Sequence, residues 1–91
     1  MKKPSKILVI DDEMNICDLF KAFLTRYNFE VDTCLHPDDA LAAITANDYD
    51  CLLLDFSLPD MSALDFITKV EEIMLTKQCL AENKTIPPFI L

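Results

Sequence analysis

The sequence contains no glycine among its 91 residues. Glycine is the residue that most readily enters the left-handed backbone region at the end of a helix, and asparagine is the next most permissive. Helices in this chain are therefore expected to end at asparagines, and Asn28, Asn47 and Asn83 stand at suitable places.

Basic residues are scarce: 8 lysines and arginines face 16 aspartates and glutamates, for a net charge of −8. This balance excludes a nucleic-acid-binding surface, which needs clustered positive charge. It suits a divalent cation or a basic partner. No apolar run approaches membrane-spanning length, and the N-terminus lacks the apolar core of a signal peptide, so we expect a cytoplasmic protein without membrane contact.

Two residue types that often carry chemistry give weak signals here. The sequence has four cysteines without a C-x-x-C pair, and all lie within apolar patterns, so we interpret them as reduced core residues rather than metal ligands or disulfides. His36 is the single histidine, and it directly precedes Pro37 at the start of a predicted helix. A loop or capping role is favoured over catalysis.

Apolar periodicity predicts alternating strands and helices in one domain, residues 1–91. Such an order requires a parallel sheet with right-handed crossovers, an α/β fold. The first predicted helix carries an apolar stripe at helical spacing, formed by Ile16, Phe20, Phe23 and Tyr27. The predicted strands are 6–10, 29–34, 51–55 and 86–91, and the predicted helices are 14–27, 37–47 and 62–80.

The stretch that begins at Cys51 is the most informative. An unbroken apolar run ends on Asp55, and Ser62 then starts a helix as an N-cap with Asp65 three positions on. A strand buried on both faces thus delivers an aspartate to the carboxyl edge of the sheet, where open α/β sheets bind their ligands.

Asp11 and Asp12 follow the first strand as Asp55 follows the third, so the three carboxylates are expected to converge. Acids after a strand can also simply cap the next helix. Convergence at one edge instead suits Mg²⁺ or Mn²⁺, which would neutralise an incoming phosphoryl group while Asp55 forms an aspartyl phosphate. The pattern indicates phosphoryl transfer.

These motifs resemble the receiver domain of two-component response regulators over Lys6 to Leu91. The resemblance implies a flavodoxin-like parallel sheet, a sensor histidine kinase or phosphotransfer protein as the phosphoryl donor, and Mg²⁺ as the ion. It implies no enzyme beyond self-catalysed phosphorylation and dephosphorylation. The stretches that carry it are Ile7–Glu13, Asn47–Asp55 and Leu58–Met61.

By this resemblance Asp55 is the phosphoacceptor. Asp12 is a direct metal ligand, Asp11 a ligand largely through water, and Ser57 a ligand through its main-chain carbonyl. A magnesium-dependent phosphatase is disfavoured, because the known aspartate-based families have a second acid two residues after the nucleophile, where this chain has Ser57.

Some features depart from the family pattern. Ala63 stands where the family usually has glycine, the segment before Ile86 is longer than usual, and the sequence ends at Leu91 before the family's fifth strand and last two helices. The alternative function is therefore a non-switching binding or assembly fragment that retains only the acidic metal site. We also expect an uncovered fourth strand and first helix to favour a homodimer.

Overall fold

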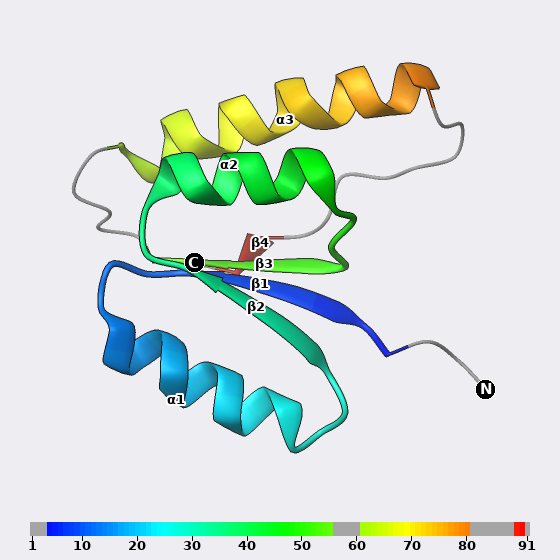
Figure 1. Cartoon of the computed structure of the whole chain (residues 1–91). Coiled ribbons are helices and arrows are strands. Elements are labelled where there is room, and N and C mark those ends of the chain that lie inside the picture. Colours follow the sequence, from blue (N-terminus) through cyan, green and yellow to red (C-terminus); the bar gives the residue numbers. More distant parts are fainter. Residues whose placement is uncertain (1–3, 56–60, 81–88, 91) are drawn as a thin grey trace.

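The structure, a computed structural model, describes residues 4–55, 61–80 and 89–90. Its strands and helices alternate along the chain, as the sequence predicts (Figure 1). The elements are β1 (Lys6–Ile10), α1 (Met14–Thr25), β2 (Glu30–Cys34), α2 (Pro37–Ala46), β3 (Cys51–Leu54), α3 (Ala63–Leu80) and β4 (Phe89–Ile90).

The strands form one parallel sheet in the order β2-β1-β3-β4, the flavodoxin-like arrangement that the resemblance implies. Ile10, the last residue of β1, pairs with Cys34 of β2 and with Leu54 of β3. The carboxyl ends of these strands are therefore level, and the residues that follow β1 and β3 emerge side by side.

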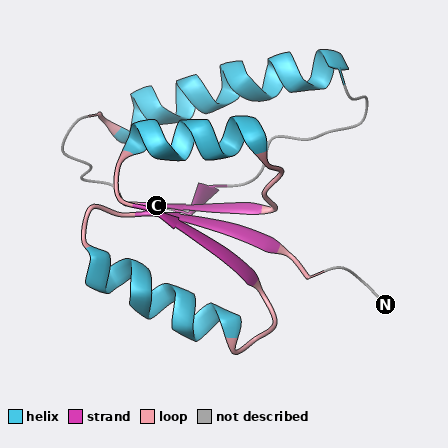
Figure 2. Ribbon diagram, in the orientation of Figure 1, coloured by secondary structure: helices cyan, strands magenta, loops and turns pink. Residues whose placement is uncertain are grey.

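The helices lie on both faces of the sheet: α2 and α3 cover one face and α1 lies on the other (Figures 1 and 2). The larger core cluster fills the space under α2 and α3, with Phe66 and Val70 of α3 fully buried. The cluster on the α1 side is smaller. Its buried members are Ile7, Val9, Cys17 and Val31.

Asparagine replaces glycine where the first helix turns into β2. Among the described residues, Asn28 alone has a positive φ, of 68°. Across this turn the N–H of Phe29 donates to the carbonyl of Leu24 (3.3 Å). Asn47 follows the last residue of α2, and its N–H donates to the carbonyl of Ala43 (2.9 Å). Both predicted helix ends are confirmed, but only Asn28 is left-handed, because Asn47 is extended (φ −133°). Asn83 lies outside the described residues.

The apolar stripe of α1 is not its buried face. Cys17 is buried and Leu24 is partly buried against the sheet, whereas Phe20, Phe23 and Tyr27 are 41%, 53% and 62% exposed. Periodicity located an apolar side of this helix, but α1 has apolar residues along two lines. The line that contains Cys17 is the one that contacts β1 and β2.

Three of the four cysteines fall in the described cores. Cys17 is buried, Cys34 and Cys51 are half-buried, and all three are free thiols, as expected. His36 occupies the N-cap position of α2 without a side-chain capping bond. No helix among the described residues is long and apolar enough to cross a membrane.

Candidate metal centre

Backbone hydrogen bonds extend the sheet by one residue at its carboxyl edge. The N–H of Asp11 donates to the carbonyl of Cys34 (3.1 Å), and the N–H of Asp55 donates to the carbonyl of Ile10 (2.8 Å). These bonds fix the backbones of both aspartates at the same level as the strand ends. Their side chains therefore start from neighbouring positions on a rigid edge.

The carboxylates of Asp11, Asp12 and Asp55 converge as the sequence predicts. Each offers an oxygen, and the three oxygens all lie within 4.8 Å of one another. Asp11 and Asp55 are half-buried, and Asp12 is exposed. Hard oxygen donors at this spacing match the ligands that Mg²⁺ prefers. The residues present therefore fit a divalent cation.

The surroundings of Asp12 disfavour the ionised form of its carboxyl. Desolvation raises the pKa of its carboxyl, and a hydrogen bond with Asp55 and the negative charges of Asp55 and Asp11 raise it further. A cation bound among the carboxylates would oppose this effect, because it favours the ionised form.

Helix capping explains only part of this cluster. Asp11 Oδ1 accepts a hydrogen bond from the N–H of Glu13 (2.9 Å), which holds the turn into α1. Glu13 is the N-cap residue itself, and its side chain makes no capping bond. The capping interpretation thus accounts for Asp11 but for neither Asp12 nor Asp55.

Cys17 is a supporting residue that the sequence did not single out. Its Sγ lies 3.4 Å from the carbonyl oxygen of Asp11 and 3.9 Å from that of Cys34, so the thiol can donate to either carbonyl below the acidic cluster. Burial and the charge of Asp11 raise the pKa of this thiol, which keeps it protonated as a donor. Its only sequence signal was a cysteine in an apolar pattern.

The predicted ligand Ser57 lies outside the described residues, so its carbonyl remains a prediction. Ser62 lies within them, and its Oγ accepts from the N–H of Asp65 (3.1 Å), which confirms the predicted N-cap of α3.

A second polar group of residues lies near the opposite end of the sheet, and sequence reasoning missed it. The hydroxyl of buried Tyr49 donates to Asp32 Oδ2 (2.7 Å), and Lys6 Nζ lies 3.8 Å from the same oxygen. The Lys6 backbone N–H also donates to Asp50 Oδ2 (2.7 Å). These contacts join β1, β2 and the turn before β3, and they have a structural role.

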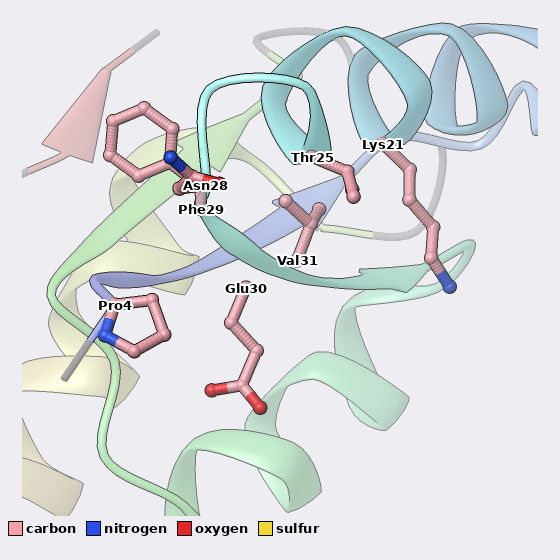
Figure 3. Close-up of a pocket in the computed structure, with 7 residues that line it drawn as sticks. All are labelled: Pro4, Lys21, Thr25, Asn28, Phe29, Glu30 and Val31. Atoms are coloured by element: carbon pink, nitrogen blue, oxygen red, sulfur yellow. The ribbon is translucent and has the colours of Figure 1, made fainter.

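The cleft in Figure 3 is separate from the acidic cluster. It lies along the outer edge of β2 and the last turns of α1, with a volume of about 710 Å³. Its charged lining residues are Lys21 and Glu30, which do not form a converging set of ligands. The acidic cluster at the carboxyl edge of the sheet is therefore the candidate functional site.

Comparison with known proteins identifies the family of this chain. Residues 7–81 match the response regulator receiver domain family. The transcriptional regulatory protein SrrA of Staphylococcus aureus is 37% identical over 86 residues, and the match covers 88% of this chain and 36% of SrrA. This chain thus spans about a third of that relative.

Solved structures agree. A CheY-like receiver domain from Methylobacillus flagellatus superposes with a TM-score of 0.72 at 26% identity, over 96% of this chain and 67% of that one. The response regulator TrrA of Thermotoga maritima, solved in complex with Mg²⁺ and BeF, gives 0.66 at 34% identity, over 81% of this chain and 62% of that one. With its sheet order and its matched residues, the chain belongs to the response regulator receiver domain family.

Proposed function

We propose that this chain accepts a phosphoryl group on Asp55 in a Mg²⁺-dependent reaction of two-component signalling. The observation that carries the proposal is the convergence of Asp11, Asp12 and Asp55 at the end of the sheet. Family membership and the Mg²⁺ and BeF bound by TrrA support it. We propose the cytoplasm as the site of the reaction.

The proposed site residues have two roles, metal binding and acceptance of the phosphoryl group. Asp11 and Asp12 would hold the ion together with Asp55 and the Ser57 carbonyl. When bound, Mg²⁺ would neutralise charge on the phosphoryl oxygens. The phosphoryl group comes from a phosphohistidine of the donor protein. An Asp55 carboxylate oxygen forms the new O–P bond while the N–P bond to that histidine's imidazole breaks. That nitrogen keeps the electron pair and takes up a proton, which leaves an acyl phosphate on Asp55.

The proposed donor is a sensor histidine kinase or a histidine phosphotransfer protein. A second copy of this chain, bound through β4 or α1, is a further proposed partner. The net charge of −8 favours a basic partner surface and disfavours direct nucleic-acid binding.

The direct test is incubation with a small acyl phosphate and Mg²⁺, followed by intact-mass measurement and peptide mapping. We expect one phosphoryl adduct on Asp55, absent when a chelator replaces Mg²⁺ and absent in Asp55→Asn. Asp38→Asn, which removes an acid at the start of α2, is the matched control and should keep the adduct. A wild-type chain that binds Mg²⁺ but never gains the adduct would favour the alternative, an assembly fragment that retains only the metal site.

A further inference from the structure

One buried side chain of α1 lies beneath the turn that carries two of the proposed metal ligands. Cys17 is 1% exposed and is the one fully buried residue of α1, a helix that the structure describes throughout. It belongs to the core cluster that contains Ile7, Val9 and Val31. These neighbours are apolar, so packing alone would explain a small residue at this position. The polar contacts of its thiol indicate a second role.

Hydrogen bonds close a ring around the turn that follows β1. The N–H of Glu13 donates to Asp11 Oδ1 (2.9 Å), and the N–H of Cys17 donates to the carbonyl of Glu13 (3.2 Å). The thiol of Cys17 reaches back to the carbonyl of Asp11, with Sγ 3.4 Å from that oxygen. Asp12 lies between these residues in the chain, so the ring fixes the backbone on both sides of it.

A further bond ties this ring to the sheet. The N–H of Asp11 donates to the carbonyl of Cys34 (3.1 Å), and Cys17 Sγ lies 3.9 Å from the same oxygen. The thiol therefore lies against both the start of the acidic turn and the end of β2. A thiol has a single proton and is a weak donor, and the shorter distance makes the Asp11 carbonyl its main acceptor.

We propose that Cys17 is a positioning residue for the metal site, which acts through the Asp11 carbonyl on the placement of Asp11 and Asp12. This inference rests on the Mg²⁺-dependent function proposed above. Removing a group that orients metal ligands commonly lowers metal affinity by about tenfold or more. Because a thiol is a weak donor, we expect a smaller effect, of about threefold. A residue that only fills the core would leave metal affinity unchanged.

Calorimetric titration of the full chain with Mg²⁺ compares two substitutions of this residue. Cys17→Ala removes the donor, and the Kd for Mg²⁺ should rise about threefold or more. Cys17→Ser keeps a donor of similar size, and its Kd should stay within about twofold of the wild-type value. If Cys17 only filled the core, serine would be the more harmful substitution, because it buries a hydroxyl that alanine lacks. That order, or an equal Kd in all three proteins, would overturn the proposal.

Leu24→Ala is the matched control for lost packing. Leu24 is partly buried against the same core cluster as Cys17, but it lies near the other end of α1. Its substitution should lower the Tm and leave the Kd for Mg²⁺ within about twofold of wild type. A rise in Kd as large as that of Cys17→Ala would overturn the proposal, because loosening of α1 would then be sufficient to weaken the site.

Infrared spectroscopy gives a readout on the wild-type chain that a purely structural role would not change. The S–H stretch shifts with the strength of the thiol hydrogen bond, and the Cys17 band is the one that Cys17→Ser removes. This band should shift when Mg²⁺ binds. The band of Cys51, which begins β3 at the end far from Asp55, should not. A Cys17 band that Mg²⁺ leaves in place would overturn the proposal.

The same titrations separate this inference from the proposed function. A wild-type chain that binds no Mg²⁺ would overturn the proposed metal site, and this inference with it. A wild-type chain that binds Mg²⁺ with the same Kd as Cys17→Ala would overturn this inference alone.

Discussion

At the scale of single residues, the three aspartates of the acidic cluster differ in their hydrogen bonds and in their exposure. Asp11 is engaged by the N–H of Glu13, Asp55 is fixed through its backbone to β1, and Asp12 is exposed with a raised pKa. Because Asp12 is exposed, we expect its substitution to disturb the strand ends less than substitution of Asp11 or Asp55.

Asp12→Asn should have opposite effects on metal binding and on stability. We expect Mg²⁺ affinity to fall at least tenfold, because a charged ligand is lost. The Tm of the metal-free protein should rise, because two carboxylates repel less than three. Calorimetric titration and thermal melts in chelator measure both. A lowered metal-free Tm would mean that Asp12 stabilises the fold directly.

Tyr49 lies near the end of the sheet that is opposite the acidic cluster, and its hydroxyl is expected to stabilise the fold. It is 8% exposed, and its hydroxyl donates to Asp32. Tyr49→Phe should cost about 1.5–3 kcal/mol of unfolding free energy, the usual contribution of a hydrogen bond to a charged group. Urea unfolding measures it. Tyr27→Phe, at an exposed ring, is the matched control and should cost little.

The same hydroxyl gives a pH dependence. Burial raises the pKa of Tyr49, and the hydrogen bond and charge of Asp32 raise it further. The folded state favours the neutral phenol of Tyr49. The stability that this phenol contributes is therefore complete below the pKa of tyrosine in the unfolded chain, about 10. It is lost as pH rises through the higher pKa of Tyr49 in the folded chain. The stability difference between wild type and Tyr49→Phe should therefore be constant below about pH 10 and shrink above it. A difference that grows with alkaline pH would contradict this assignment.

At the scale of elements, local signals decided where helices begin and end. Asn28 takes the left-handed conformation that glycine would otherwise provide, and Ser62 caps α3 through Asp65. Both were predictable because the interactions span only a few residues.

Ser62→Ala should lower the unfolding free energy by about 1 kcal/mol, because the N–H of Asp65 loses its acceptor. Ser62→Asp keeps an acceptor at the same position and should retain most of the stability. Equal destabilisation by both substitutions would show that Ser62 acts through something other than the cap.

The face of a helix was harder to predict than its ends. For α3 the predicted apolar side is also the buried side, with Phe66, Val70 and Met74 in the core. For α1, two apolar lines compete. Cys17 is on the buried line because α1 crosses β1 and β2, and this position is a property of the assembled sheet.

At the scale of the whole molecule, metal binding and folding should be coupled. The ligands come from both β1 and β3 ends, so the site exists only when these strands pair. An ion that binds only the folded chain stabilises it by about 2.7 kcal/mol at a concentration of 100 times Kd. We therefore expect the Tm to rise steadily with Mg²⁺, and much less so in Asp12→Asn. An equal rise in both would indicate a different site.

The sequence by itself determined the strand and helix order, the parallel sheet, and the aspartates that follow β1 and β3. Short-range periodicity and strand topology suffice for these, since parallel strands bring their carboxyl ends to one edge. Only the tertiary structure decided which line of α1 is buried, that Cys17 supports the acidic turn, and that Tyr49 reaches Asp32. Each of these depends on the distance between residues far apart in the chain, which the packing of helices on the sheet fixes and local sequence does not encode.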